Sequence, residues 1–112
     1  MYQVTAIIRP HRLEDVKAAV ADVGVTGISV SDVRGCGNSP EPPMFLAGQE
    51  IKIALPLKSK LVTVITDEQL EPVIEAILMH AHTGEPGDGK IFVERVSDAI
   101  RIRTMERGNS AV

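Results

Sequence analysis

Two separate stretches of this 112-residue chain, residues 1–36 and 57–93, show the same succession of hydrophobic patterns. Each begins with β-type residues, changes to apolar residues spaced three and four apart, and returns to β-type residues, which predicts strand, helix, strand. Two such units are typical of the split β-α-β, ferredoxin-like arrangement. The order therefore predicts an α+β fold, an antiparallel βαββαβ sheet with both helices on one face. We find no linker that would divide residues 1–112 into two domains.

In the first half, residues 2–9 predict a strand, which ends at Pro10 because proline cannot donate to the ladder. An apolar stripe at helical spacing predicts a helix over residues 13–23, with Gly24 as its stop. Residues 25–34 combine Val and Ile with Thr and Ser and predict the second strand.

In the second half, residues 57–66 predict a strand, and residues 66–69 (Thr-Asp-Glu-Gln) have the pattern of a capping box at a helix start. The apolar stripe of that helix consists of Leu70, Val73, Ile74, Ile77 and Leu78. A fourth strand begins at Ile91. Residues 99–103 predict a short fifth strand, with Arg101 and Arg103 on one face.

Residues 38–56, between the two halves, show no sustained pattern and include Pro40, Pro42 and Pro43. A loop of this length is unusual in a compact domain and is usually functional or disordered. The alternation at residues 51–53 predicts a short strand on its return side.

The composition excludes several classes of protein. The net charge is −3, hydrophobic residues make up 44% and charged residues 24%, as in a soluble globular protein. Apolar runs stay far below the ~18 residues of a membrane span, and the N-terminus does not resemble a signal peptide. The one cysteine excludes an intrachain disulfide, so we expect a cytoplasmic protein. Negative charge and few aromatic residues argue against a nucleic-acid binder.

Residues 83–90 read Thr-Gly-Glu-Pro-Gly-Asp-Gly-Lys, between the second helix and the fourth strand. Glycine can take positive φ and let the backbone approach a ligand closely. Successive N–H groups then form a nest for a phosphate, with Lys90 at its rim. The spacing is neither that of a P-loop nor that of a dinucleotide fingerprint. These eight residues alone fit a plain helix-to-strand turn equally well.

Other chemistry finds little support in the sequence. The acidic pairs at residues 14–15 and 67–68 lie at helix starts, where they are interpreted as caps rather than as acid–base catalysts. His80 and His82 do not share a helical face, and no ligand spacing completes a metal site. Cys36 has no partner base in its sequence context. We therefore predict no catalytic residue and no resident metal.

Positive charge and glycine instead gather at the ends of the predicted elements. The set comprises Gly35, Gly37, Lys58, Lys60, Lys90, Arg101 and Arg103. On a split β-α-β sheet these residues could surround a polyphosphate, because Arg offers a planar fork of donors and Lys a point charge. The alternative is that they are solvated edge charges that hinder sheet aggregation.

Three motifs together are far more specific than any one of them: residues 6–10 (Ala-Ile-Ile-Arg-Pro), residues 83–93, and residues 100–108 with Ile-Arg-Ile-Arg-Thr and Glu-Arg-Gly. With them, the chain resembles the PII signal-transduction family from end to end, without insertion or deletion. The resemblance implies a homotrimer of ferredoxin-like subunits that binds an adenine nucleotide (ATP, ADP or AMP) in each cleft between neighbours.

The resemblance also implies the residues of the site. Those expected around the adenosine are Ile7, Ser29, Gly35, Cys36, Gly37 and Val64. Those expected at the phosphates are Gly87, Gly89, Lys90, Arg101 and Arg103, with Asp88 in the same nucleotide-binding loop, the family's B-loop. The family's T-loop, which docks on transporters and enzymes, corresponds to residues 37–55. Its apolar tip, the expected partner contact, is Met44, Phe45 and Leu46.

The T-loop is where this sequence departs from the family. Typical members have Arg-Gln-Lys-Gly after the second glycine, where this chain has Asn38, Ser39, Pro40 and Glu41, and a nucleotidylated tyrosine where it has Ile51. Modification at that tyrosine is therefore impossible here. Without the Arg and Gln, the preferred nucleotide, the use of magnesium and the sensing of 2-oxoglutarate stay open, although Lys58 remains as a candidate for a second ligand. Divergent relatives are linked to bicarbonate uptake or to other membrane transporters.

The leading hypothesis is a non-enzymatic regulator, in carbon or nitrogen assimilation, whose T-loop changes its order when nucleotide binds. One alternative is a slow ATPase in the same cleft, for which the sequence offers no evident base. The other is a small-molecule sensor of the ACT-like, amino-acid-binding type, which shares the βαββαβ topology.

Overall fold

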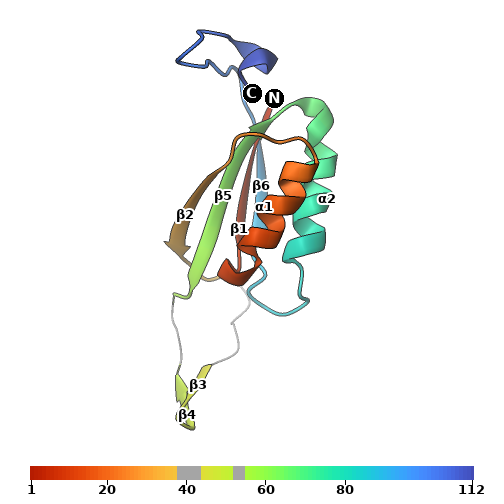
Figure 1. Ribbon diagram of the computed structural model, residues 1–112. Coiled ribbons are helices and arrows are strands. Elements are labelled where there is room, and N and C mark those ends of the chain that lie inside the picture. Colours follow the sequence, from red (N-terminus) through yellow and green to blue (C-terminus); the bar gives the residue numbers. More distant parts are fainter. Residues whose placement is uncertain (38–43, 52–54) are drawn as a thin grey trace.

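The computed structural model describes residues 1–37, 44–51 and 55–112 (Figure 1). The elements of its main body are β1 (Tyr2–Ile8), η1 (Pro10–Arg12), α1 (Leu13–Asp22), β2 (Ser29–Arg34), β5 (Leu57–Ile65), η2 (Asp67–Gln69), α2 (Leu70–Ala81), β6 (Lys90–Arg95) and η3 (Gly108–Ala111). A separate hairpin consists of β3 (Met44–Leu46) and β4 (Gln49–Ile51).

The four longer strands form one sheet in the order β2-β5-β1-β6, and every pairing is antiparallel. Val4 of β1 lies opposite Thr63 of β5 on one side and opposite Val93 of β6 on the other. Each half of the chain thus supplies one central strand and one edge strand. The predicted α+β, ferredoxin-like arrangement is confirmed.

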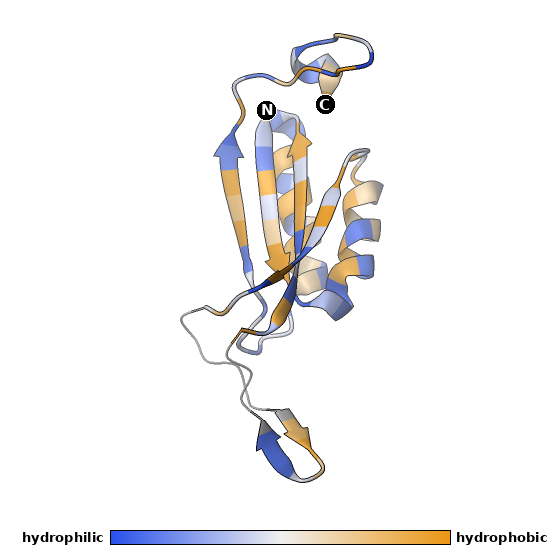
Figure 2. Cartoon of the chain, turned by 90° about the vertical axis from the view of Figure 1, so that its left-hand side faces the viewer, coloured by the Kyte–Doolittle hydropathy of each residue, from blue (hydrophilic) through white to orange (hydrophobic). Residues whose placement is uncertain are grey.

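Both helices cover the same face of the sheet (Figure 1). Side chains alternate along a strand, so Val4, Ala6 and Ile8 of β1 point toward the helices. The buried core between the layers consists of Val4, Ala6, Ile8, Val16, Val20, Leu61, Ile65, Val73, Ile77 and Ala81. Figure 2 views the sheet from its other side, over which the described part of the chain places no helix.

The helix-free face has an apolar centre with charges around it. Val62 and Phe92 flank Thr5 across the sheet, and Phe92 is 51% exposed. Ile7 lies between Lys60 and Lys90 in the register. An exposed face of this kind is suited to contact with another molecule.

The helix boundaries follow the predicted signals closely. Gly24 has a φ of 101° just beyond the end of α1. At the start of η2, which leads directly into α2, the backbone N–H of Thr66 donates to Oε1 of Gln69 at 3.1 Å, so the predicted capping box is present. Among the described residues, no helix is long and apolar enough to cross a membrane.

Two strand predictions need correction. Residues 99–103 do not form a fifth strand, because a turn at residues 102–104 reverses the chain and leaves a single antiparallel bridge, Ile100 to Arg107. Met105 has a φ of 63° at this reversal, and its N–H donates to the carbonyl of Arg101 at 2.7 Å. The arginines at 101 and 103 are therefore not aligned by strand alternation. The predicted second strand begins at Ser29 rather than at residue 25.

The return side of the long loop does carry a short strand, β4, which shares Ile51 with the predicted residues 51–53, whereas residues 52 and 53 lie outside the described residues. Ala47 and Gly48 form the two-residue turn of the β3–β4 hairpin, with φ of 52° and 78°. Positive φ at both central positions is the geometry of a tight hairpin turn. The hairpin projects beyond the end of the main sheet (Figure 1).

Candidate functional site

The glycine-rich loop between α2 and β6 has the backbone geometry predicted for an anion nest. Gly84, Gly87 and Gly89 have φ of 89°, 103° and 100°. At Gly89 the requirement is also steric, because a Cβ there would lie 1.6 Å from the carbonyl oxygen of Ile7. The close passage of this loop over β1 therefore needs glycine at position 89.

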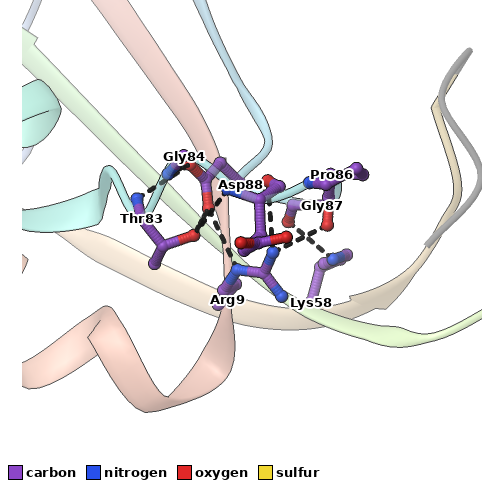
Figure 3. Close-up of polar contacts among 8 residues, drawn as sticks. Arg9, Lys58, Thr83, Gly84, Pro86, Gly87 and Asp88 are labelled. Atoms are coloured by element: carbon purple, nitrogen blue, oxygen red, sulfur yellow. Dashed lines mark hydrogen bonds and ion pairs between the residues drawn. The ribbon is translucent and has the colours of Figure 1, made fainter. Parts of the chain in front are cut away.

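The carboxylate of Asp88 is the internal anchor of the loop (Figure 3). It accepts hydrogen bonds from the backbone N–H of Thr83 at 2.8 Å and of Gly84 at 2.9 Å, from the Thr83 hydroxyl, and from Nε of Arg9 at 3.0 Å. Burial alone would raise the pKa of Asp88, but the hydrogen bonds from Thr83, Gly84 and Arg9 outweigh it and hold the pKa well below its usual range. Asp88 is therefore ionised at neutral pH.

Two cations hold the carbonyl groups of the same loop (Figure 3). Nη2 of Arg9 donates to the carbonyls of Pro86 at 2.7 Å and Glu85 at 3.3 Å. Nζ of Lys58, a buried side chain on β5, donates to the carbonyl of Gly87 at 2.8 Å. Lys58, predicted as a contact for a second ligand, is thus engaged with the loop.

The glycine-rich loop lies at the end of the sheet where β1 ends and β6 begins. There the structure brings together Ile7 and the loop residues Gly87, Asp88, Gly89 and Lys90. Ile7 lies opposite Lys90 in the register of β1 and β6. Figure 1 places this loop at the end of the sheet from which the β3–β4 hairpin also projects.

A second group of predicted residues lies at the opposite end. Ser29, Val64 and Arg101 line one open groove of about 490 Å³, together with Gly27 and the last two residues of the chain. The guanidinium of Arg101 donates to Oε1 of Glu106 at 3.1 Å. Arg103 lies nearby in the turn and is exposed.

The register measures how far apart the two groups are. On β5, Lys60 lies opposite Ile7 and Val64 lies opposite Gln3, four residues further along. At about 3.3 Å per residue, Val64 and Ile7 are ~13 Å apart along the sheet. Within one subunit, residues expected around the same adenosine therefore lie at different ends of the sheet. The same is true of Lys90 and Arg101, which are both expected at the phosphates.

The segment that carries Arg101 is closed by a clasp that the sequence reasoning did not identify. The carboxylate of Asp98 accepts from Nε of Arg107 at 3.0 Å and from the N–H groups of Ala99 at 2.9 Å and Gly108 at 3.2 Å. The hydrogen bond from Arg107 is the main reason why the pKa of Asp98 is lowered. An aspartate and an arginine on either side of a reversal are the signal that could have revealed it.

The predicted residues at the root of the long loop follow the end of β2. The N–H of Gly35 donates to the carbonyl of Pro56 at 3.1 Å, and Nη1 of Arg34 to that of Leu55 at 3.4 Å. Cys36 and Gly37 are exposed. Among the described residues, a Cβ at Gly35 or Gly37 would meet no atom within 4 Å beyond the chain neighbours.

The predicted partner contact lies on the hairpin. Phe45 and Leu46 are 69% and 68% exposed. Figure 2 shows β3 as hydrophobic and β4 as hydrophilic. Met44 lies on β3, opposite Ile51.

Two of the remaining polar candidates, Asp67 and His80, have structural partners. Asp67 accepts from the N-terminal ammonium at 2.6 Å, and Nδ1 of His80 lies 2.9 Å from the carbonyl of Ala76. Within residues 1–37, 44–51 and 55–112, no three His, Cys, Asp or Glu side chains gather as metal ligands would.

The model of the family "Nitrogen regulatory protein P-II" matches residues 1–106. The chain belongs to the PII family. This PII chain is 44% identical over 112 residues to the nitrogen regulatory protein P-II of Pasteurella multocida, with all of both chains covered. It is 42% identical to the nitrogen regulatory protein P-II 2 of Methanothermobacter thermautotrophicus, covering 100% of this chain and 97% of the relative.

Among solved structures, this PII chain is similar to the crystal structure of Arabidopsis thaliana PII bound to citrate. The TM-score is 0.80 and the identity 43%, with 99% of this chain and 91% of that chain covered. Proteins of the PII family are regulatory signal transducers. The predicted family and fold are therefore confirmed.

Proposed function

We propose that this PII protein is a non-enzymatic signalling protein that binds an adenine nucleotide between neighbouring copies of the chain. The observation that carries this proposal is the division of the predicted site between two ends of one sheet. The glycine loop with Lys90 forms one half-site, and the groove with Arg101 forms the other. Two copies that bring unlike ends together would complete a site that a single copy leaves open.

The helix-free sheet face supports such an assembly. Its centre is apolar at Val62 and Phe92, with Phe92 51% exposed. Contact between unlike ends is a heterologous interface. Such an interface forms a closed ring when the rotation from one copy to the next returns to the first copy after a whole number of steps. A trimer with three equivalent nucleotide clefts is the assembly that we propose. Sedimentation or light scattering of the pure protein tests it, and a monomer at micromolar concentration would argue against it.

Phosphate groups would lie at the glycine loop, where N–H groups and Lys90 supply positive potential. The test is calorimetry with ATP, ADP and AMP on the wild type and on Lys90→Ala. We expect Lys90→Ala to weaken binding of the strongest ligand about tenfold or more, because a charge-assisted hydrogen bond contributes roughly 1.5–3 kcal/mol. Lys17→Ala is the matched control, since Lys17 pairs with Glu14 on the exposed side of α1. No binding heat with any of the three nucleotides would refute the proposal.

The T-loop would convey nucleotide occupancy to a membrane transporter or a metabolic enzyme in carbon or nitrogen assimilation. The exposed side chains of Phe45 and Leu46 suit an apolar cleft on that partner. A second small anion such as bicarbonate or 2-oxoglutarate would bind near Lys58. Repeating the titrations with each anion and with magnesium shows which of them changes nucleotide affinity.

A slow ATPase is disfavoured by the state of Asp88. Its carboxylate accepts four hydrogen bonds, which hold its pKa well below the usual range. It is therefore a weak base that is poorly suited to take a proton from water. Steady release of phosphate by the pure protein, lost in Lys90→Ala, would favour the enzyme instead.

A further inference from the structure

We infer that Arg9 and Asp88 are positioning residues for the phosphate site, because together they set the direction in which the peptide groups of residues 83–90 point. This inference rests on the proposed function and deepens it. It concerns what aims the backbone N–H groups, rather than which groups touch the nucleotide.

Arg9 ties the loop to the sheet. It follows β1 directly, its side chain is 18% exposed, and its guanidinium reaches the Asp88 carboxylate and two carbonyls of the loop. The guanidinium is planar and rigid, so it fixes these acceptors relative to one another. Since Arg9 directly follows the end of the central strand β1 and does not belong to the loop, it also fixes them relative to β1.

The carbonyl contacts determine where the N–H groups face. The carbonyl of Pro86 points to Arg9 and that of Gly87 points to Lys58. The described chain has no cis peptide bond, and in a trans peptide the C=O and the following N–H point in opposite directions. The N–H of Gly87 is therefore directed away from Arg9, and the N–H of Asp88 is directed away from Lys58. In the proposed site these two N–H groups face the phosphate.

Asp88 completes this arrangement from within the loop. Its carboxylate takes the N–H groups of Thr83 and Gly84, so the start of the loop is closed on itself. The Arg9 contact also offsets the negative charge that would otherwise repel a phosphate. The side chain of Asp88 thus acts as an anchor, while its backbone N–H belongs to the anion-binding edge.

The experiment compares Arg9→Lys and Asp88→Asn with the wild type, using ATP and adenosine as ligands. Displacement of a fluorescent ATP analogue measures both affinities, including that of the weaker ligand. Asp67→Asn is the matched control, because the Asp67 carboxylate also pairs with a cationic group, the N-terminal ammonium, but lies in η2, away from the glycine loop. We expect both loop variants to weaken ATP binding about tenfold or more, with adenosine binding changed less than about twofold.

A purely structural role predicts a different pattern. If the variants only lowered the fraction of competent protein, ATP and adenosine would weaken by the same factor. Equal weakening, or unchanged ATP affinity in both variants, would overturn the inference. Arg9→Lys retains the positive charge, so it carries the test if Asp88→Asn does not fold, as judged by circular dichroism. A wild type that binds neither ligand refutes the proposed function instead.

An independent measurement uses the ligand-free protein. The amide NMR signals of Gly87 and Asp88 should shift in Arg9→Lys, and that of Gly87 should shift in Asp88→Asn, because their peptide groups reorient. They should stay unchanged in Asp67→Asn. Unshifted signals in both loop variants would contradict the positioning role.

Discussion

The geometry of Gly89 allows its replacement to be predicted in quantitative terms. Gly89→Ala introduces two separate penalties: a φ of 100° that alanine disfavours, and a Cβ that would lie 1.6 Å from the carbonyl oxygen of Ile7. The first costs about 1–2 kcal/mol. The second can be relieved only by moving the loop away from β1, which breaks the end of the β1–β6 ladder. We expect a total loss of more than about 3 kcal/mol in the free energy of unfolding.

Two other glycines separate these penalties. Gly84 has a φ of 89°, and the one described atom near its Cβ position is His82 Cε1 at 4.0 Å, so Gly84→Ala should cost about 1–2 kcal/mol. Gly27 has no positive φ, and among the described residues no atom beyond its chain neighbours lies within 4 Å of its Cβ position, so Gly27→Ala should be neutral or stabilising by up to about 1 kcal/mol. Urea unfolding at one fixed protein concentration, followed by circular dichroism, measures all three. A Gly89→Ala cost equal to that of Gly84→Ala would refute the steric argument.

Three further predictions follow from named contacts. The pKa of Asp88 is lowered in the folded state, so its contribution to stability is fully present above pH ~4, the ordinary pKa, and is lost as the pH falls through the folded value. Stability measured against pH should therefore fall less steeply below pH ~4 in Asp88→Asn, and an unchanged slope would contradict this. Thr63→Val removes the hydroxyl that donates to the carbonyl of Gly27 at 2.6 Å and should cost about 1–3 kcal/mol in urea unfolding, whereas Thr63→Ser should cost less. Asp98→Ala should release the loop that holds Arg101 and weaken nucleotide binding in calorimetry. The free energy of unfolding should change by less than about 1 kcal/mol, because the clasp is exposed. Equal affinity would show that the clasp does not place Arg101.

The fold could be predicted from sequence because each signal was local. Periodicity identified the four long strands and both helices, and the capping box at Thr66 and the glycine at position 24 marked helix ends that the structure reproduces. The failure at residues 99–103 has an equally local cause. Alternating Ile and Arg fit a strand, but the left-handed Met105 and the Asp98 clasp reverse the chain, and neither is visible as periodicity.

The site was harder to predict because its parts are joined by register rather than by spacing. Arg9 reaches a carboxylate 79 positions away, and Lys58 reaches a carbonyl 29 positions away. Such contacts become evident only when β1 lies between β5 and β6. The same register shows that Ile7 and Val64 lie at different ends of the sheet, although the resemblance to PII proteins assigns both to one adenosine. A site whose halves lie ~13 Å apart along one subunit can close around one ligand if the halves come from different copies. The complete site then exists only in the assembly, so the pattern of residues within a single chain does not predict it.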